Sequence, residues 1–200
     1  MKTPTRILII NVHSANNAGD RALLECTIQQ LSNALPTAEI VISANRPHEE
    51  YFQSCNYKVV PSFTFLAGQG QNIPVIQQIS SAVKGWQQTH QRTRSTPNPW
   101  QEMAKEFQEA DFVVGVAGNQ FHSSGKFSWP LILLSAEVQL AHDYHKPFYT
   151  MPQTNGPFRS SWEIQLIKHI YRKGRIVFLR DPISINLANE IGLEDVVNFA

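Results

Sequence analysis

Short apolar runs rich in β-branched residues alternate with longer amphipathic stretches along most of this chain. The short runs predict buried strands, and the regions in which apolar residues recur at helical spacing predict helices. The predicted strands are residues 7–12, 39–43, 58–61, 111–116, 147–151, 175–179 and 196–197. The predicted helices are residues 20–34, 46–54, 99–110, 130–145, 160–173 and 182–191.

This alternation predicts the fold class. Nearly continuous apolar strands are typical of a parallel sheet that is covered on both faces, and the intervening helices provide the crossover connections. Helix-start signals agree, because Asp20 and Asp181 stand where they can cap helices and Pro182 occupies a first helical position. We therefore expect an α/β protein with a Rossmann-like, doubly wound parallel sheet.

Residues 67–101 interrupt the alternation. They are rich in Gln, Ser, Thr and Asn, with three basic residues and no acidic residue. Apolar spacing predicts a short helix over 73–86, and we expect residues 90–99 to form a mobile loop. Two interpretations stay open: a solvated insertion, or a lid or membrane-surface patch in which Trp86 and Trp100 flank the basic residues.

Composition limits the classes of function. With 200 residues and 42% hydrophobic content, the chain can bury the core of one domain. Its 17 basic and 16 acidic residues give a net charge of +1, which argues against nucleic-acid binding. Its apolar runs are too short for a secretory leader or a membrane span, so we expect a soluble protein. Cys26 and Cys55 are predicted to be buried free thiols, consistent with a cytoplasmic location.

The candidate chemistry lies in the segments that follow the predicted strands. In an open parallel sheet, ligands bind beyond the carboxyl ends of the strands, where the strand order reverses. The four such segments are residues 13–19, 115–125, 152–158 and 180–181.

The first segment offers the amides of Asn16 and Asn17, then Gly19 and Asp20 at the expected start of a helix. Free N–H groups there can receive an anion or sugar hydroxyls. Asp20 has two open interpretations, a structural cap or a catalytic, hydroxyl-binding carboxylate, and a capping carboxylate would repel an anion. Because the chain has no G-x-G-x-x-G or Walker pattern, we do not expect nucleotide binding.

The second segment is the richest in glycine and polar residues. Gly118 allows a close backbone approach, while Asn119, Gln120 and His122 can hydrogen-bond a carbohydrate. His122 is a candidate general acid or base, with a purely structural loop histidine as the alternative.

The two later segments offer fewer groups. Asn155 and Gly156 follow one strand, and Arg180 follows another, where it can bind an anion or pair with Asp181. We expect no metal site, because His142 and His145 lack a third ligand nearby.

Taken together, these segments resemble the polysaccharide pyruvyl transferase family. The run from Asn17 to Leu24, NAGDRALL, is similar to the family's N-x-G-D-x-A-h-h segment after its first strand. Residues 113–121 resemble its second glycine-rich strand and loop, residues 153–158 resemble its segment ending in Gly-Pro, and residues 180–184 match R-D-x-x-S. A helix over residues 186–192 follows, as in the family.

The resemblance implies an enzyme that transfers the enolpyruvyl carbons of phosphoenolpyruvate to two hydroxyls of a saccharide, or a lipid-linked saccharide, as a ketal. Phosphoenolpyruvate is then the donor substrate, and no cofactor is expected. The family resembles two-domain glycosyltransferase-B architectures, so residues 1–200 are expected to be the N-terminal domain, with the second domain absent from this chain. In the family, the residues that bind phosphoenolpyruvate lie largely in that second domain.

Within that resemblance, Asp20 and His122 are the expected catalytic residues. The expected substrate-binding residues are Asn16, Asn17, Gly19, Gly118, Asn119, Gln120, Asn155, Gly156 and Arg180. The first two segments depart from the family's glycine pattern, with His13, Ser14 and Ala15 in one and Val116 and Ala117 in the other. Two alternatives therefore stay open: a non-catalytic sugar-binding domain, and a nucleotide-sugar glycosyltransferase of the same architecture. The oligomeric state and peripheral contact with a membrane also stay open.

Overall fold

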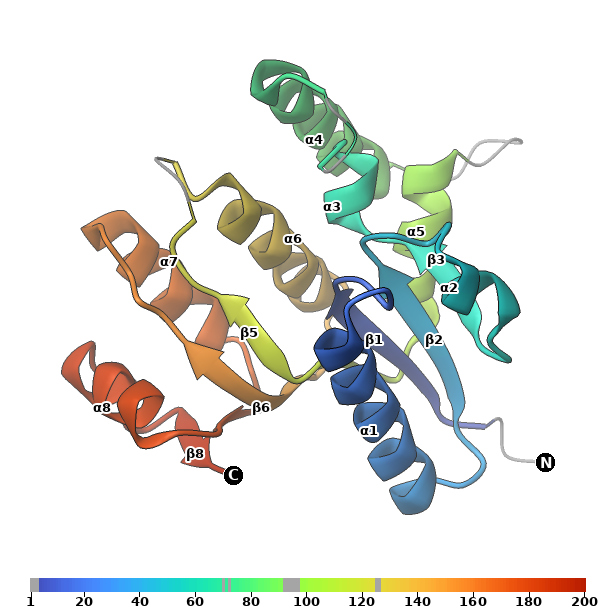
Figure 1. Cartoon of the computed structure of the whole chain (residues 1–200). Helices are drawn as coiled ribbons and strands as arrows, with labels where there is room; N and C mark the ends of the chain where they lie inside the picture. Colours follow the sequence, from blue (N-terminus) through green and yellow to red (C-terminus); the bar gives the residue numbers. More distant parts are fainter. Residues whose placement is uncertain (1–3, 70, 72, 92–97, 125–126) are drawn as a thin grey trace.

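The computed structural model describes residues 4–69, 71, 73–91, 98–124 and 127–200 (Figure 1). The strands are β1 (Arg6–Val12), β2 (Glu39–Ala44), β3 (Lys58–Pro61), β4 (Phe112–Gly115), β5 (Gly118–Phe121), β6 (Phe148–Asn155), β7 (Ile176–Leu179) and β8 (Val197–Phe199). The helices are α1 (Ala18–Ala34), α2 (Glu50–Ser54), α3 (Phe63–Leu66), α4 (Val75–Thr89), α5 (Pro99–Glu109), α6 (Trp129–Asp143), α7 (Ser161–Tyr171) and α8 (Pro182–Glu190).

The strands form a single parallel sheet in the order β3-β2-β1-β4-β6-β7-β8, and β5 pairs with β6. From β1 the chain adds β2 and β3 on one side, and then crosses to add β4 and the later strands on the other side. The strand order therefore reverses between β1 and β4, which are directly paired. This is the predicted Rossmann-like, doubly wound fold, and it places the reversal point at the carboxyl ends of β1 and β4.

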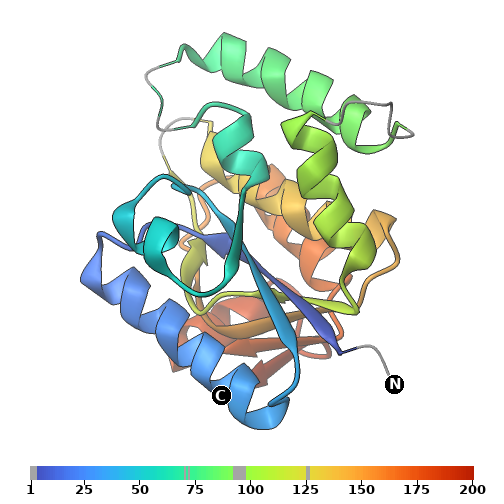
Figure 2. The ribbon, with the colours of Figure 1, turned by 90° about the vertical axis from the view of Figure 1, so that its right-hand side faces the viewer.

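Alternate residues of β1 enter the two halves of the core. Leu8 and Ile10 pack among residues of α5 and α6, whereas Ile9 packs against Leu24 and other residues of α1. Val12 joins the same cluster as Ile9, since the register of β1 shifts between these two residues. Figure 2 shows the corresponding layers, with α1 below the sheet, α5 and α6 above it, and α4 outermost. Burial on both faces explains why the strands are apolar throughout.

The structure confirms the predicted helices and strands with shifted ends, and it adds α3 and β5. The predicted loop 115–125 contains a short strand, because Gly118 and Phe121 pair with Gln153 and Asn155 of a longer β6. The prediction that Asp20 caps a helix is wrong. The Asn17 side chain caps α1 by accepting from the N–H groups of Gly19 and Asp20. Asp181 does cap α8, with Pro182 in the first turn.

Within the described residues of the segment 67–101, α4 packs one face on the rest of the protein and exposes the other, so the segment is solvated only in part. In α4, Gly85 lies directly against the Trp100 ring, where a Cβ would come within 2.5 Å of it. Trp86 and Trp100 both pack on Phe63 and so do not form the exposed edge of a membrane patch. Of the expected mobile loop, residues 92–97 lie outside the described residues, and Asn98 forms a capping box with Gln101 at the start of α5.

Both cysteines are free, as predicted, but neither is buried. Cys26 is exposed and Cys55 is intermediate, because the buried face of α1 runs through Leu24, Thr27 and Ile28 instead.

The most buried carboxylate, Glu137 of α6, joins three elements at the reversal point. Its side chain is fully buried and accepts hydrogen bonds from the Asn11 N–H (3.1 Å), the Ser43 hydroxyl (2.6 Å) and the Phe63 N–H (3.1 Å). These donors belong to β1, β2 and the first turn of α3. Burial raises the pKa of Glu137, and the three hydrogen bonds oppose that shift.

Glu137→Ala should destabilise the protein by about 3 kcal/mol or more, because it leaves three buried donors without an acceptor. Glu194→Ala, at an exposed position, is the control and should change stability by less than about 0.5 kcal/mol. Urea unfolding followed by circular dichroism measures both values. A loss under about 1 kcal/mol for Glu137→Ala would show that these donors find other partners.

Candidate functional site

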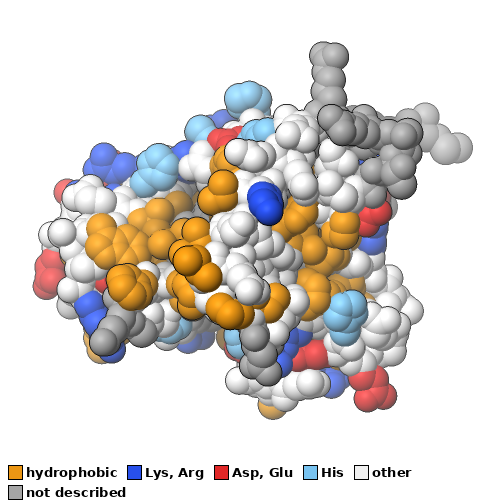
Figure 3. Space-filling view, turned by 90° about the horizontal axis from the view of Figure 1, so that it is seen from above, with side chains coloured by type: hydrophobic (Ala, Val, Ile, Leu, Met, Phe, Trp, Pro, Cys, Tyr) orange, Lys and Arg blue, Asp and Glu red, His pale blue; other side chains and the backbone are white. Residues whose placement is uncertain are grey.

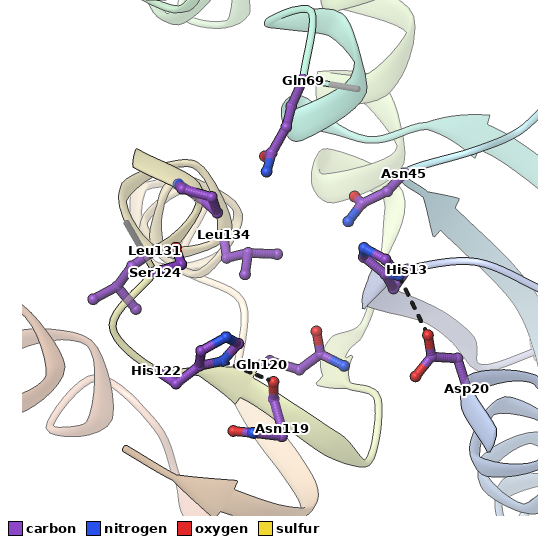
Figure 4. A pocket seen from close by; sticks show the side chains of 11 residues that line it. His13, Asp20, Asn45, Gln69, Asn119, Gln120, His122, Ser124, Leu131 and Leu134 are labelled. Atoms are coloured by element: carbon purple, nitrogen blue, oxygen red, sulfur yellow. Dashed lines mark hydrogen bonds and ion pairs between the residues drawn. The ribbon is translucent and has the colours of Figure 1, made fainter. Parts of the chain in front are cut away.

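A polar cavity of about 360 Å³ lies at the carboxyl ends of β1 and β4, where the strand order reverses. His13 and Asp20 line one side of it, and Asn119, Gln120 and His122 line the other (Figure 4). Helix α6 supplies an apolar wall through Pro130, Leu131 and Leu134. Polar groups that converge beside an apolar surface are typical of a small-molecule site.

On the first side, His13 and Asp20 form a pair. The distance from His13 Nδ1 to Asp20 Oδ2 is 3.3 Å, and both side chains retain solvent exposure. The Asn17 cap fixes the start of α1 and so places Asp20 in the first turn, next to the loop. With Nδ1 directed to the carboxylate, the imidazole has its Nε2 available for another partner.

Glu49, just before α2, holds the same loop from behind. Its carboxylate accepts from the Ser14 hydroxyl and the Ala15 N–H, both at 2.6 Å, and from the Asn16 N–H at 3.2 Å. The expectation that free N–H groups here receive an anion is therefore wrong, because Glu49 and Asn17 already occupy them. The loop presents side chains to the cavity in place of backbone donors.

On the opposite side, β5 carries the polar residues. Gly118 has a φ of +145° and approaches Leu23 of α1, which brings the start of β5 close to the first loop. Asn119 is exposed and Gln120 is half-buried, while His122 Nδ1 lies 3.2 Å from the Asn119 carbonyl oxygen. His122 therefore keeps its Nε2 side for the cavity, across from His13 (Figure 4).

Three further polar side chains line the cavity: Ser124, in the predicted segment 115–125, and Asn45 and Gln69, which sequence reasoning missed. The Ser62 hydroxyl donates to Asn45 Oδ1 (2.7 Å), which directs the amide nitrogen of Asn45 away from Ser62. Asn45 follows β2, so the rule about strand ends applies to it, but the segment after this strand was not among the four considered. Gln69 follows α3, a helix that the apolar pattern did not predict. His13 was noticed only as a departure from the family pattern.

The other predicted site residues lie elsewhere. Asn155 and Gly156 line a separate cavity of about 510 Å³ beside α8. Asn155 is buried and accepts from the Tyr171 hydroxyl (3.3 Å), while Gly156 has a φ of +77° and lies against Leu187. Arg180 donates through Nε to the Thr154 hydroxyl (2.7 Å) at the edge of that cavity.

Asn16 lines a third cavity of about 520 Å³ together with Arg46, His48 and Glu49. This third cavity adjoins the first, since Asn45 and Gln69 line both. The predicted residues that line a cavity are thus divided between one adjoining pair of cavities and one separate cavity. Asn17 and Gly19 support the first loop, where Asn17 acts as the helix cap.

Within the described residues, no group of three or more His, Cys, Asp or Glu side chains is arranged to hold a metal ion. In the same part of the chain, none of the helices combines the length and apolar character needed to cross a bilayer.

Comparison with known proteins identifies the family. The model of the polysaccharide pyruvyl transferase family matches residues 17–199, which is most of the chain. This chain belongs to the polysaccharide pyruvyl transferase family. The match begins at Asn17, in the loop that lines the polar cavity, and extends through β8. No curated protein matches the sequence.

Membership in the polysaccharide pyruvyl transferase family implies a transferase that acts on a polysaccharide acceptor. The cavity has groups suited to a saccharide, because amides and a carboxylate can hydrogen-bond hydroxyls in both donor and acceptor roles. It also holds two imidazoles, which are the side chains best suited to moving a proton near neutral pH.

A third carboxylate, Glu163 of α7, holds the segment that carries His122. It is buried and accepts from the hydroxyls of Ser123 (2.8 Å) and Ser128 and from the Arg159 N–H (2.7 Å). Burial alone would raise the pKa of Glu163, but the hydrogen bonds from Ser128, Ser123 and Arg159 outweigh it and lower the pKa to about 2.

We expect Glu163→Gln to lose about 2 kcal/mol of stability at pH 7. Because the pKa of Glu163 is lower in the folded protein than its ordinary value of 4.5, the wild-type advantage is complete above about pH 4.5 and disappears as the pH falls toward 2. Urea unfolding of both proteins between about pH 2.5 and about pH 7 measures the difference. A difference that stayed constant over this range would mean that Glu163 does not ionise in this way.

Proposed function

We propose that this chain takes part in the transfer of the enolpyruvyl carbons of phosphoenolpyruvate to a saccharide, which binds in the polar cavity between β1 and β4. The observation that carries this proposal is the coincidence of the family match with a cavity at the reversal point of the sheet. Ligands of doubly wound folds bind at that point.

The reaction has a definite proton balance. Two hydroxyls of the acceptor add to the enol carbon of phosphoenolpyruvate, and inorganic phosphate leaves. One hydroxyl proton is matched by the proton that converts the methylene carbon to a methyl group, and the other leaves with phosphate. The site must therefore provide a base for each hydroxyl and an acid for the methylene carbon.

We assign Asp20 and His122 as the catalytic residues, one on each side of the cavity. Asp20 would act on an acceptor hydroxyl, either directly or by orienting His13 at 3.3 Å. His122 would supply the proton for the methylene carbon or accept one from the second hydroxyl. Asn119 and Gln120 would bind the acceptor hydroxyls, with Asn16 in the adjoining cavity binding a further part of the saccharide.

The remaining predicted residues would act in support. Asn17, Gly19 and Gly118 would shape the two loops through the helix cap and the close approach of β5 to α1. Asn155 and Gly156 line the separate cavity beside α8. Arg180, which donates to Thr154 at the edge of that cavity, is the predicted contact for an anion. We expect most of the residues that bind phosphoenolpyruvate to lie in a second Rossmann-like domain, as in the family. The proposed location of the reaction is the cytoplasm.

The release of phosphate tests the reaction directly. The protein is incubated with phosphoenolpyruvate and a panel of saccharides, and phosphate release is measured together with mass spectrometry of the saccharide. We expect phosphate release that depends on a saccharide and yields a ketal on it. Release without a saccharide, or saccharide binding with no release, would contradict the proposal, and the second result would favour the non-catalytic alternative. Turnover of a nucleotide-sugar in a parallel reaction would favour a glycosyltransferase.

Asp20→Asn should lower the turnover number by about 100-fold or more, because the amide cannot accept a proton from an acceptor hydroxyl. Glu25→Gln is the matched control, as it removes a carboxylate from an exposed position of the same helix and should leave turnover within about twofold. Equal turnover by Asp20→Asn and the wild type would remove Asp20 from the catalytic residues.

A further inference from the structure

A hydrophobic surface lies on the outside of the molecule where α4 meets the first turns of α6 and α7. Its side chains border a shallow apolar groove of about 530 Å³, and Figure 3 shows the hydrophobic area with a basic side chain within it. Ile76 and Phe127 are 76% and 79% exposed, which is unusual for large apolar side chains. The other exposed members are Val75, Ile79, Ile132 and Trp162.

The elements beneath this surface are firmly packed. Trp129 at the start of α6 donates through its indole N–H to Gln78 of α4 (2.9 Å), and Gln78 in turn donates to the Ile73 carbonyl (2.8 Å). The inner face of α4 buries Ala82 and Gly85 against the rest of the protein. Helix α4 therefore has a satisfied inner face and a second apolar face that remains exposed.

Cations and acids differ in exposure near this surface. Helices α6 and α7 carry three acidic residues in the described part of the chain: Glu137 and Glu163 are buried, and the Asp143 carboxylate lies 3.2 Å from His90 Nε2. By contrast, Lys84 of α4 and Arg159, just before α7, are exposed. The rim of this surface therefore favours an anionic partner.

We propose that this surface binds the face of a lipid bilayer that contains anionic lipids. An apolar helix face with aromatic neighbours and flanking cations is the combination that inserts at a membrane interface. A symmetric pair of copies fits less well, because it would bring the same cationic rims together. The sequence-based membrane patch around Trp86 and Trp100 is thereby replaced by one around Ile76, Phe127 and Trp162.

The hydrophobic surface and the polar cavity lie on different sides of the first turns of α6. Trp129 and Ile132 face the surface, whereas Leu131 and Leu134 face the cavity. A helix is about 10 Å wide, so membrane binding would hold the cavity close to the bilayer. Vesicle binding is measured without turnover, so the test of this inference is independent of the proposed function.

The test is flotation of the protein with vesicles of phosphatidylcholine alone or mixed with phosphatidylglycerol. We expect binding to the anionic vesicles that is about tenfold stronger and weakens with salt. Ile76→Glu and Phe127→Glu should each reduce it by about tenfold or more. Lys84→Glu should reduce the preference for anionic vesicles while leaving the apolar side chains in place.

Ile183→Glu is the matched control, because Ile183 and Ile76 both occupy the second position of a helix and are 79% and 76% exposed. It should bind like the wild type. Absence of wild-type binding, or an equal loss for Ile183→Glu and Ile76→Glu, would overturn the proposal. Sedimentation velocity identifies the rival occupant: a dimer that Ile76→Glu abolishes, with no vesicle binding, would make the surface an interface between copies and also overturn it.

Discussion

The buried carboxylate of Glu137 is the interaction on which the arrangement of the cavity depends. It lies on α6 and accepts hydrogen bonds from the end of β1, from β2 and from the start of α3. Burial disfavours the charged form of this carboxylate and so raises its pKa. The burial is tolerated because three donors hydrogen-bond to the carboxylate. Leu131 and Leu134 precede it on α6 and form the apolar wall of the cavity, so the same helix joins the strand ends to that wall.

Glu49 and Glu163 repeat this arrangement at the two loops that border the cavity. Glu49 binds the loop after β1, and Glu163 binds the segment after β5. Carboxylates of the protein thus occupy backbone and hydroxyl donors that could otherwise bind a ligand. The groups left for a ligand are the side chains of His13, Asp20, His122 and Ser124 and a set of amides, which suit neutral hydroxyls better than an anion. This arrangement agrees with the proposed binding of a saccharide in this cavity.

The sequence was sufficient for the fold class, because continuous apolar strands and amphipathic helices determine the alternation of elements. It was also sufficient to predict that Asp20, Asn119, Gln120 and His122 approach one another, since each follows a strand that ends at the same edge. It did not reveal that Asn155 and Gly156 line a different cavity, because that depends on the order of strands across the sheet. No local sequence pattern indicates that Glu49 and Glu163 fix the two loops, since their hydrogen-bond partners are distant in sequence. Helix α1 begins earlier than the apolar pattern indicated, so its cap is Asn17 and not Asp20.

Amide NMR during titration with the saccharide that best supports phosphate release tests most directly where the acceptor binds. If it binds between β1 and β4, the largest shifts fall on the loop after β1, on Asn45 and on residues 118–124. Shifts confined to Asn155, Gly156 and the start of α8 would place the acceptor in the other cavity and contradict the assignment.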